Sequence, residues 1–341
     1  MRKVSQVKET LSTIASRLGV SVSTVSRVLS GDARRHRIPQ ATAERIMEEA
    51  RRCHYTPSHS AKTLRTSKSY AIGVVIPSLS NPFFADMASV IISEASLHGY
   101  TTIIIDTMEA ESNQKLALES MSARQVEGII AAPCGGEEDL LALDASGIPV
   151  VLVDRYFEDT TLPYVTTNNY KGGVLATRAL IDAGHKDIVC LQGVTSSMPN
   201  KMRVRGYTDT MKEAGLEDRI KVVGREFSIQ NGYLETRMLL KGQDRPGAIF
   251  ALSNTIGLGA MKAIREMNLR IPEDISMISF DNNIYLDYMI PPIARVSQML
   301  EDMARLATKV LFERISNPGM PASHVMLTPT LIPGGSIKNA R

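Results

Sequence analysis

The sequence predicts two structural parts: a small head of α-helices, and an α/β body of two doubly wound lobes, each built on a parallel sheet. Two observations support this division. Residues 1–68 hold 14 of the 39 Lys and Arg residues but only 5 of the 36 Asp and Glu residues. From Tyr70 onward, short β-branched runs alternate with helical stretches, a pattern typical of parallel sheets covered on both faces. A basic head on an acidic body indicates a nucleic-acid partner.

The overall composition is that of a globular protein of 341 residues, with 43% hydrophobic and 22% charged residues. No apolar run reaches the ~20 residues that span a bilayer. No apolar segment follows the first basic residues, so we expect no secretory signal and a cytoplasmic location. The cysteines, Cys53, Cys134 and Cys190, are odd in number and widely spaced, which argues against a disulfide framework or a zinc site.

The head begins with two short helices. Thr10 can cap a helix over 11–18, whose apolar residues recur at helical spacing. Gly19 suits a left-handed turn, and Ser21 can cap a second helix. Its inner side carries Val22, Val25, Val28 and Leu29. Two helices joined by so short a turn predict a helix-turn-helix.

A third helix is expected over 41–53, with Ile46, Met47 and Ala50 facing inward.

The outer face of the second helix suits the major groove of DNA. Ser23, Ser26 and Arg27 project from one side, so the guanidinium can reach a guanine edge or a phosphate. Val22, at the leading end, can only contact apolar surface such as a thymine methyl group. The alternative is a small helical bundle with a polar surface. Serines are poor helix formers, which disfavours that alternative.

Residues 57–68 form the next predicted element, a short linker helix. Pro57 fits a first helical turn, and Ala61 and Leu64 share one face. Such a helix is shorter than the ~12–15 residues needed for marginal stability in water. We therefore expect it to form only against a twin in a dimer and a DNA groove.

The body alternates nine predicted strands with seven predicted helices. The strands read AIGVVIP, YTTIIID, GIIAAP, PVVLVD, DIVCLQG, IKVVG, GAIFA, ISMISF and ARVS. The helices are expected at 83–98, 111–125, 171–184, 203–214, 230–241, 256–268 and 300–315. Nine strands with helical crossovers over ~260 residues predict two doubly wound lobes.

In these motifs the chain resembles the lactose-repressor (LacI/GalR) family of bacterial transcription regulators along nearly its whole length. The motifs include LSTIASRLGVSVSTVSRVLSG, YTPSHSAKTLRTSKSYAIGVVIPSLSNPFF, VEGII, IPVVLVDR, GHKDIVCLQG, RVRGY, GLGAMKAIREMNLRIPEDISMISFDN and PPIARVSQ. The resemblance implies a homodimer that binds operator DNA and responds to a small effector, with no enzyme activity and no cofactor.

The resemblance also implies roles for residues of the head. Val22 and Ser23 match positions that choose bases, while Thr24, Ser26 and Arg27 match contact or phosphate-facing positions. Phosphate-clamping positions correspond to Thr10, Ser21 and Thr42. Leu64 matches a leucine that wedges into the minor groove, with Ala61 beside it, and such a wedge bends the duplex.

One segment departs from the family pattern. Between the second and third helices stands SGDARRHRIPQ, which is longer than in the shortest members of the family. Arg34, Arg35 and Arg37 make it basic. It is either an additional contact to the DNA backbone or a solvated loop without a role.

The resemblance implies that the body has two lobes of periplasmic-binding-protein type joined by three crossovers. We place the crossovers near 167–171, 292–298 and 324–329. The expected parts are the helix-turn-helix head 1–56, the hinge helix and linker 57–68, an N-terminal lobe of 69–168 with 298–325, and a C-terminal lobe of 169–297 with 326–341.

Ligands of such lobes bind where strands end, in the cleft between lobes. The resemblance places Asp154, Arg203 and Asp281 at the effector as polar contacts, and Phe84 and Phe227 as stacking rings. The resemblance places Ser78 there too, and Asn254, which follows a strand, completes the expected set. The alternatives are structural: Asp154 as a cap of the next turn, Arg203 as its ion-pair partner, and Asp281 as a support for its own loop.

The effector we favour is a sugar or sugar acid, because carboxylates and Arg pair with vicinal hydroxyls and rings cover C–H faces. A purine that stacks on Phe84 is the alternative. A sugar-binding transport protein or a doubly wound enzyme is less consistent with the basic head and with SLSNPFF, which is not a phosphate loop. The last residues carry no leucine heptads, which predicts a dimer rather than a zippered tetramer.

Overall fold

The computed structural model describes residues 9–53, 55, 68–242 and 244–339. The chain divides into two compact units, Met1–Ser69 and Tyr70–Arg341. The first is a helical head and the second is an α/β body, which confirms the predicted fold class. Within the described ranges no helix combines the length and the apolar character that crossing a bilayer requires.

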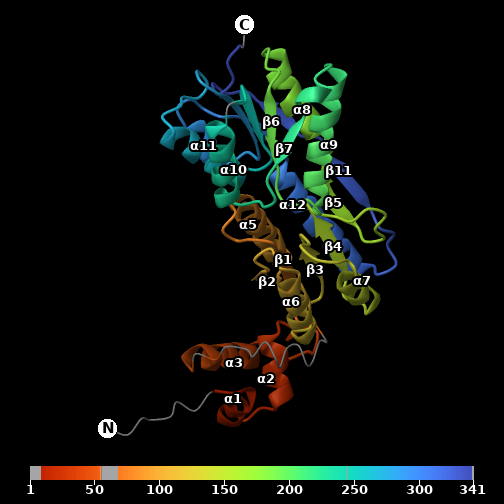
Figure 1. The fold of residues 1–341 in the computed structure, drawn as a ribbon. Helices are drawn as coiled ribbons and strands as arrows, with labels where there is room; N and C mark the ends of the chain where they lie inside the picture. Colours follow the sequence, from red (N-terminus) through yellow and green to blue (C-terminus); the bar gives the residue numbers. More distant parts are fainter. Residues whose placement is uncertain (1–8, 54, 56–67, 243, 340–341) are drawn as a thin grey trace. The chain divides into compact units, whose positions relative to one another are not determined.

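Three helices form the described part of the head (Figure 1): α1 Leu11–Leu18, α2 Val22–Leu29 and α3 Gln40–Arg52. The Thr10 hydroxyl accepts a hydrogen bond from the Thr13 amide and caps α1, which ends at Gly19 in the left-handed conformation (φ 67°). The Ser21 hydroxyl caps α2 by accepting from the Thr24 amide. The two caps and the glycine turn produce the expected helix-turn-helix.

Two side chains expected on the inner side of these helices are exposed instead. The core consists of Ile14, Ala15, Val25, Val28, Ala43, Ile46 and Ala50. Val22 and Met47 are each 45% exposed. Val22 opens α2, and Met47 lies one position past the buried Ile46, so each falls at the edge of the buried stripe.

The N-terminal lobe is built on a six-stranded sheet of order β11-β5-β4-β3-β1-β2, in which all neighbours are parallel. Its strands are β1 Ala71–Ile76, β2 Thr101–Asp106, β3 Ile129–Ala131, β4 Val150–Val153, β5 Tyr164–Thr167 and β11 His324–Leu327. Its helices are α5 Pro82–Leu97, α6 Glu111–Ala123, α7 Glu138–Ala145 and α12 Leu300–Ser316.

The C-terminal lobe has a sheet of order β12-β10-β9-β8-β6-β7, in which only β12 is antiparallel to its neighbour. Its strands are β6 Ile188–Leu191, β7 Lys221–Val223, β8 Ala248–Ala251, β9 Ser276–Phe280, β10 Ala294–Ser297 and β12 Thr330–Ile332. Its helices are α8 Asn169–Asp182, α9 Met198–Glu213, α10 Ile229–Lys241 and α11 Asn254–Glu266, with short 3-10 turns η1 Glu217–Arg219 and η2 Ile284–Asp287.

Buried apolar side chains cover both faces of each sheet. In β1, Ile72, Val74 and Ile76 face α5 and α12, whereas Val75 faces the cluster that α6 and α7 cover. The late helix α12 therefore packs beside α5, although more than 200 residues separate them (Figure 1). This packing fixes the N-terminus of α5 at the edge of the sheet where β1, β3 and β4 end.

The chain passes between the two sheets three times: after β5, after β10 and after β11. Our expected boundary gave residues 326 and 327 to the C-terminal lobe, but β11 places both in the sheet of the N-terminal lobe. The sequence pattern also missed β5, β11, β12 and α7, and it started α9 five residues late. These strands are three or four residues long, too short to show a clear period.

Candidate functional site

The outer face of α2 carries a cluster of exposed hydroxyl groups. The Ser21 hydroxyl lies 2.8 Å from the Ser23 hydroxyl and 2.7 Å from the Thr24 hydroxyl. Arg27 is exposed, Ser26 is half-buried, and Arg27 forms no ion pair with any residue in the described ranges. The predicted contact residues of α2 thus share one accessible surface with polar donors and an unpaired cation.

The other predicted DNA contacts fall in three places. Thr10 is exposed but uses its hydroxyl to cap α1. Thr42 is half-buried in the first turn of α3, whose N-terminus has no side-chain cap. Ala61 and Leu64 lie outside the described residues.

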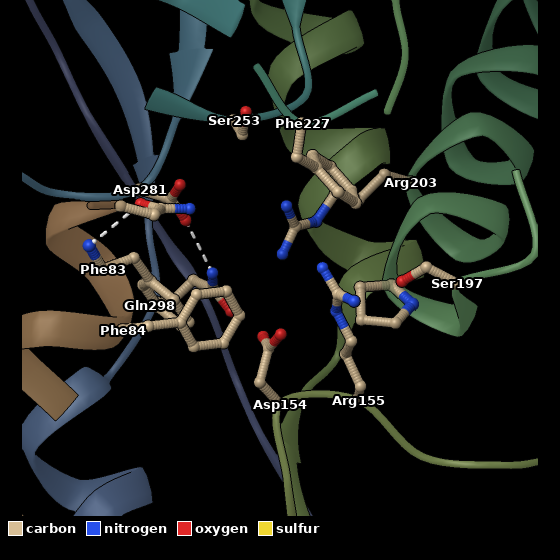
Figure 2. Close-up of a pocket in the computed structure, with 12 residues that line it drawn as sticks. Phe83, Phe84, Asp154, Arg155, Ser197, Arg203, Phe227, Ser253, Asp281 and Gln298 are labelled. Carbon is tan, nitrogen blue, oxygen red and sulfur yellow. Dashed lines mark hydrogen bonds between the residues drawn. The ribbon is translucent and has the colours of Figure 1, made fainter. Parts of the chain in front are cut away.

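A cleft lies between the two lobes of the body, where several strands end. It is lined from the N-terminal lobe by Phe84, Asp154 and Arg155, and from the C-terminal lobe by Arg203, Phe227 and Asp281 (Figure 2). The remaining lining residues are Asn81, Phe83, Ser197, Pro199, Ser253 and Gln298. Its free volume is about 20 Å³, so its own side chains nearly fill it.

Asp154 and Asp281 reach the cleft in the same way. Each directly follows a buried strand, β4 or β9, and each adopts the left-handed conformation, with φ of 60° and 75°. Both are non-glycine residues in a disfavoured region, a feature that concentrates at functional sites. The turn directs both carboxylates into the space between the lobes (Figure 2).

Arg203 is a buried cation without a carboxylate partner. Its side chain comes from α9 and the residue is 3% exposed. Nε donates to the Asn169 side chain (2.8 Å), Nη1 donates to the Leu252 carbonyl (2.7 Å), and the guanidinium lies 3.7 Å from the centre of the Phe280 ring. Arg203 forms no ion pair among the described residues, so the expected alternative, an ion pair with Asp154, does not form.

The two carboxylates differ in their hydrogen bonding. Asp281 Oδ1 accepts from Gln298 Nε2 (2.7 Å), and its Oδ2 accepts from the Asn254 amide (3.1 Å). Asp154 Oδ1 is buried without a partner among the described groups. Burial raises the pKa of Asp154 to about 6, against the opposing effect of Arg203 and Arg155. The cleft therefore presents an unsatisfied acceptor close to an unpaired cation.

Arg155 contributes the second guanidinium of the cleft. Nη1 and Nη2 donate to the two carboxylate oxygens of Glu109 at 2.8 and 2.6 Å. Its carbon Cζ lies 5.7 Å from the centre of the Phe84 ring and 5.6 Å from that of Phe227. Arg155 therefore contacts aromatic rings of both lobes.

The structure brings together five of the seven residues that were predicted to bind the effector: Phe84, Asp154, Arg203, Phe227 and Asp281. The other two do not line the cleft. Ser78 forms a hydrogen bond with Ser80 (2.8 Å). Asn254 is fully buried behind Ser253 and donates to the side chains of Asn81 and Asn283. The residue one position earlier, Ser253, occupies the lining position because it ends the extended segment before α11.

Besides Ser253 and the residues Asn81 and Phe83 at the start of α5, which were not among the predicted contacts, four other residues of the lining were missed: Arg155, Ser197, Pro199 and Gln298. Two of them carried a usable signal, because Arg155 directly follows a strand-end Asp and Gln298 directly follows β10. Ser197 and Pro199 open α9 at its true start, five residues before the expected one. The error in the helix boundary therefore hid them.

A second cavity of about 280 Å³ adjoins the cleft and shares Phe83, Asp281 and Gln298 with it. Its rim includes the carboxylates of Asp86 and Glu301. Burial and the nearby Glu301 charge raise the pKa of Asp86. The second cavity therefore has acidic side chains at its rim, whereas the cleft carries charges of both signs.

Two family descriptions match the chain. Residues 69–288 match "Periplasmic binding proteins and sugar binding domain of LacI family", and residues 10–58 match "Bacterial regulatory proteins, lacI family". Similar curated proteins include a ribose operon repressor of Haemophilus influenzae, 31% identical over 274 residues, which cover 80% of this chain and 82% of that protein. They also include an HTH-type transcriptional repressor PurR of Pasteurella multocida, 29% identical over 282 residues (82% and 84%).

Two solved structures have a similar fold. A lac repressor dimer bound to operator and the anti-inducer ONPF superposes with a TM-score of 0.87 at 23% identity, covering 97% of this chain and 100% of that one. A LacI family regulator from Enterococcus faecium with bound ribose has a TM-score of 0.73 at 25% identity, covering 80% and 100%. The first of these similarities shows the fold alone.

Proposed function

Because the chain belongs to the LacI family of bacterial regulatory proteins, and so is a transcriptional repressor rather than an enzyme, we propose that its cleft binds a small neutral sugar that controls its attachment to operator DNA. The head supplies the DNA contacts, the body supplies the effector site, and a homodimer presents two heads to a near-palindromic operator. Such a regulator acts in the cytoplasm.

The observation that carries the proposal is a buried acceptor without a hydrogen bond in the same cleft as a buried cation without an ion pair. Arg203 is a buried cation without an ion pair, and Asp154 keeps a buried oxygen without a hydrogen bond. Buried groups of this kind are costly unless a ligand completes them. A sugar hydroxyl both donates and accepts, so vicinal hydroxyls can satisfy the carboxylate and the guanidinium together.

The charge balance of the cleft favours a neutral ligand. Asp154 and Asp281 offset Arg155 and Arg203, and Glu109 adds a further carboxylate behind Arg155. A phosphate or carboxylate on the effector would add a negative charge to a site that already has more acids than bases. This refines our expectation of a sugar or sugar acid toward the uncharged sugar. The ribose operon repressors among its relatives suggest a pentose.

An apolar surface on the C-terminal lobe supports the proposed homodimer. Ile284, Tyr288 and Ile290 are exposed there. Beside them lies a groove of about 720 Å³, whose lining includes Met289 and Ile290 and is mostly apolar. Exposed apolar patches of this kind typically mark association sites, and we propose a second copy of the chain as the occupant.

The effector proposal can be tested by calorimetry on the full chain with D-ribose, other neutral pentoses and hexoses, D-ribonate and D-ribose 5-phosphate. We expect one neutral sugar to bind, with Asp281→Ala abolishing its binding but not DNA binding. Tight binding of only the charged compounds would contradict the neutral class.

The DNA proposal needs a separate test. A duplex selected from a random pool on the full chain should be shifted by that chain but not by a chain starting at Ser69. An equal shift by both would exclude the head as the DNA-binding part.

A further inference from the structure

We propose that Arg155, held in place by Glu109, limits the size of the effector by occupying the space beside both cleft rings, so that a flat bicyclic base is excluded and a small polyol is admitted. This inference rests on the proposed function, because it concerns which ligand class the same cleft accepts. The question is open because the sequence left both a sugar and a purine as effectors, and the relatives of this chain carry two different names, ribose operon repressor and HTH-type transcriptional repressor PurR.

The position of Arg155 follows from the end of β4. Asp154 turns the chain with its left-handed conformation, and the Arg155 amide donates back to the Val153 carbonyl at 2.6 Å. The tight turn sends two successive side chains toward the cleft, the carboxylate of Asp154 and the guanidinium of Arg155 (Figure 2).

Glu109 then fixes the guanidinium. The ion pair is bidentate, and Nη1 also reaches the Pro133 carbonyl at 3.4 Å. The Arg155 side chain is only 6% exposed. A bidentate contact between two planar groups restrains orientation as well as position, so Arg155 cannot swing aside without breaking two charge-assisted hydrogen bonds.

The backbone around Glu109 restrains the carboxylate in turn. Met108 and Glu109 both adopt the left-handed conformation, with φ of 52° and 56°. The Asp106 side chain accepts from the Met108 amide (2.8 Å), and the Pro77 carbonyl accepts from the Glu109 amide (2.9 Å). Two consecutive non-glycine residues in this region form a turn that the surrounding hydrogen bonds must hold.

The restrained guanidinium takes the place that a stacking ligand needs. Phe84 belongs to the N-terminal lobe and Phe227 to the C-terminal lobe, and Cζ of Arg155 lies within 6 Å of both ring centres. A purine would have to approach one of these rings to about 3.5–4.0 Å over its whole plane. Asp154, Arg203 and Asp281 line the same cleft, and we expect a small polyol to need only these hydrogen-bonding groups and no stacking area on the two rings.

The rival explanation is that Arg155 is simply a hydrogen-bond donor to the effector. The two explanations predict different results when the residue is shortened. If Arg155 is only a donor, shortening it weakens sugar binding and does not allow any new ligand to bind. If Arg155 limits the size of the ligand, shortening it allows purines to bind.

The experiment uses the full chain and two variants, Arg155→Ser and Glu109→Gln. Calorimetry measures the Kd for hypoxanthine, guanine and D-ribose, and thermal unfolding checks that each variant folds. We expect no detectable base binding by wild type, which sets a lower limit on its Kd, and a Kd at least tenfold below that limit for both variants. If Glu109 acts through Arg155, adding Glu109→Gln to Arg155→Ser should change base affinity no further.

The matched control is Asp144→Asn. It breaks the Arg314–Asp144 pair (2.7 and 3.1 Å) in the same lobe, away from the cleft, and should leave base binding absent. Folded variants that take up no purine would overturn the proposal, as would a wild-type chain that binds hypoxanthine as tightly as Arg155→Ser. Failure of every sugar to bind wild type would instead contradict the proposed effector class, while the base measurements would still decide the role of Arg155.

Discussion

Asp154 is a predicted effector contact whose burial destabilises its charged form in the ligand-free protein. Its carboxylate is buried, lacks a partner for one oxygen, and has a pKa raised to about 6 from an ordinary 3.8. A raised carboxyl pKa means that the folded state holds its proton more tightly than the unfolded state. The stabilisation is complete below about pH 4 and disappears as the pH rises through about 6.

Asp154→Asn should therefore stabilise the ligand-free chain at pH 7, by up to about 3 kcal/mol, while abolishing effector binding. The gain should shrink as the pH falls and vanish near pH 4, where the native carboxyl is also neutral. Urea unfolding at pH 4, 5, 6 and 7 measures it. Asp302→Asn, an exposed acid on α12, controls for the loss of one charge. A gain that does not change with pH would contradict the assigned cause.

Arg27→Ala should weaken operator binding by about 1–3 kcal/mol per head and leave thermal unfolding unchanged, because the side chain is exposed and forms no ion pair in the described ranges. Leu64→Ala should do the same through the loss of the minor-groove wedge. Gel shifts on the selected duplex measure both. Arg45→Ala, exposed on α3, is the matched control. Unchanged binding by both variants would reject the assigned DNA surface.

Several polar residues of the cleft could be predicted from the sequence. Parallel strands end at the same edge of a sheet, so the residues that directly follow them lie close together. Asp154 and Asp281 follow from that rule together with the family resemblance, whereas Arg203, which lies in α9, follows from the resemblance. The strand-end rule failed by one residue at Asn254 and Ser253. It predicts that a residue after the strand faces the cleft, but the sequence pattern locates the last extended residue of a strand only to within one position.

Among the elements, the loop over residues 32–38 has the least obvious role. Arg34, Arg35 and Arg37 are exposed and form no ion pair among the described residues. Backbone hydrogen bonds from His36 to Asp32 and from Ile38 to Ala33 fold it into a compact turn. The loop connects α2 with the N-terminus of α3, so it spans two predicted DNA-contacting elements.

The triple change Arg34→Gln, Arg35→Gln, Arg37→Gln should lower the salt dependence of DNA binding. Each lost phosphate contact reduces the slope of log K against log salt by about 0.9, so a dimer that loses six contacts loses about 5. Arg124→Gln, Arg225→Gln and Arg245→Gln remove the same charge from exposed sites of the body. If the slope of log K against log salt is the same for the loop variant and for wild type, the loop makes no contact with DNA phosphates.

The elements also show what local pattern can and cannot predict. The bounds of α1 and the start of α2 were predicted correctly, because Thr10, Gly19 and Ser21 have specific backbone roles. α9 was not, because Ser197 starts it without a side-chain cap and Pro199 sits within its first turn. Edge strands such as β11 and β12 form because they pair with strands that are distant in the sequence, so the local sequence pattern does not predict them.

For the whole molecule, the exposed apolar surface near η2 predicts how copies associate. Ile290→Asp should shift the chain from dimer to monomer, because a charge would have to be buried in the proposed interface. Sedimentation velocity at micromolar concentration measures the change, and operator affinity should fall with it. Ile229→Asp, an exposed apolar residue at the start of α10, is the control. A dimer that survives the change at 290 would place the interface elsewhere.

The small free volume of the cleft, about 20 Å³, has a kinetic consequence. Because the side chains of both lobes leave so little room, we predict that a hexose or pentose binds only after the lobes have moved apart. In stopped-flow mixing, the observed rate should rise with sugar concentration and then level off at the opening rate. A rate that stays linear to millimolar sugar would mean that the resting molecule is already open in solution. In that case the bimolecular association rate, and not the rate at which the lobes open, would set how fast the regulator responds to its effector.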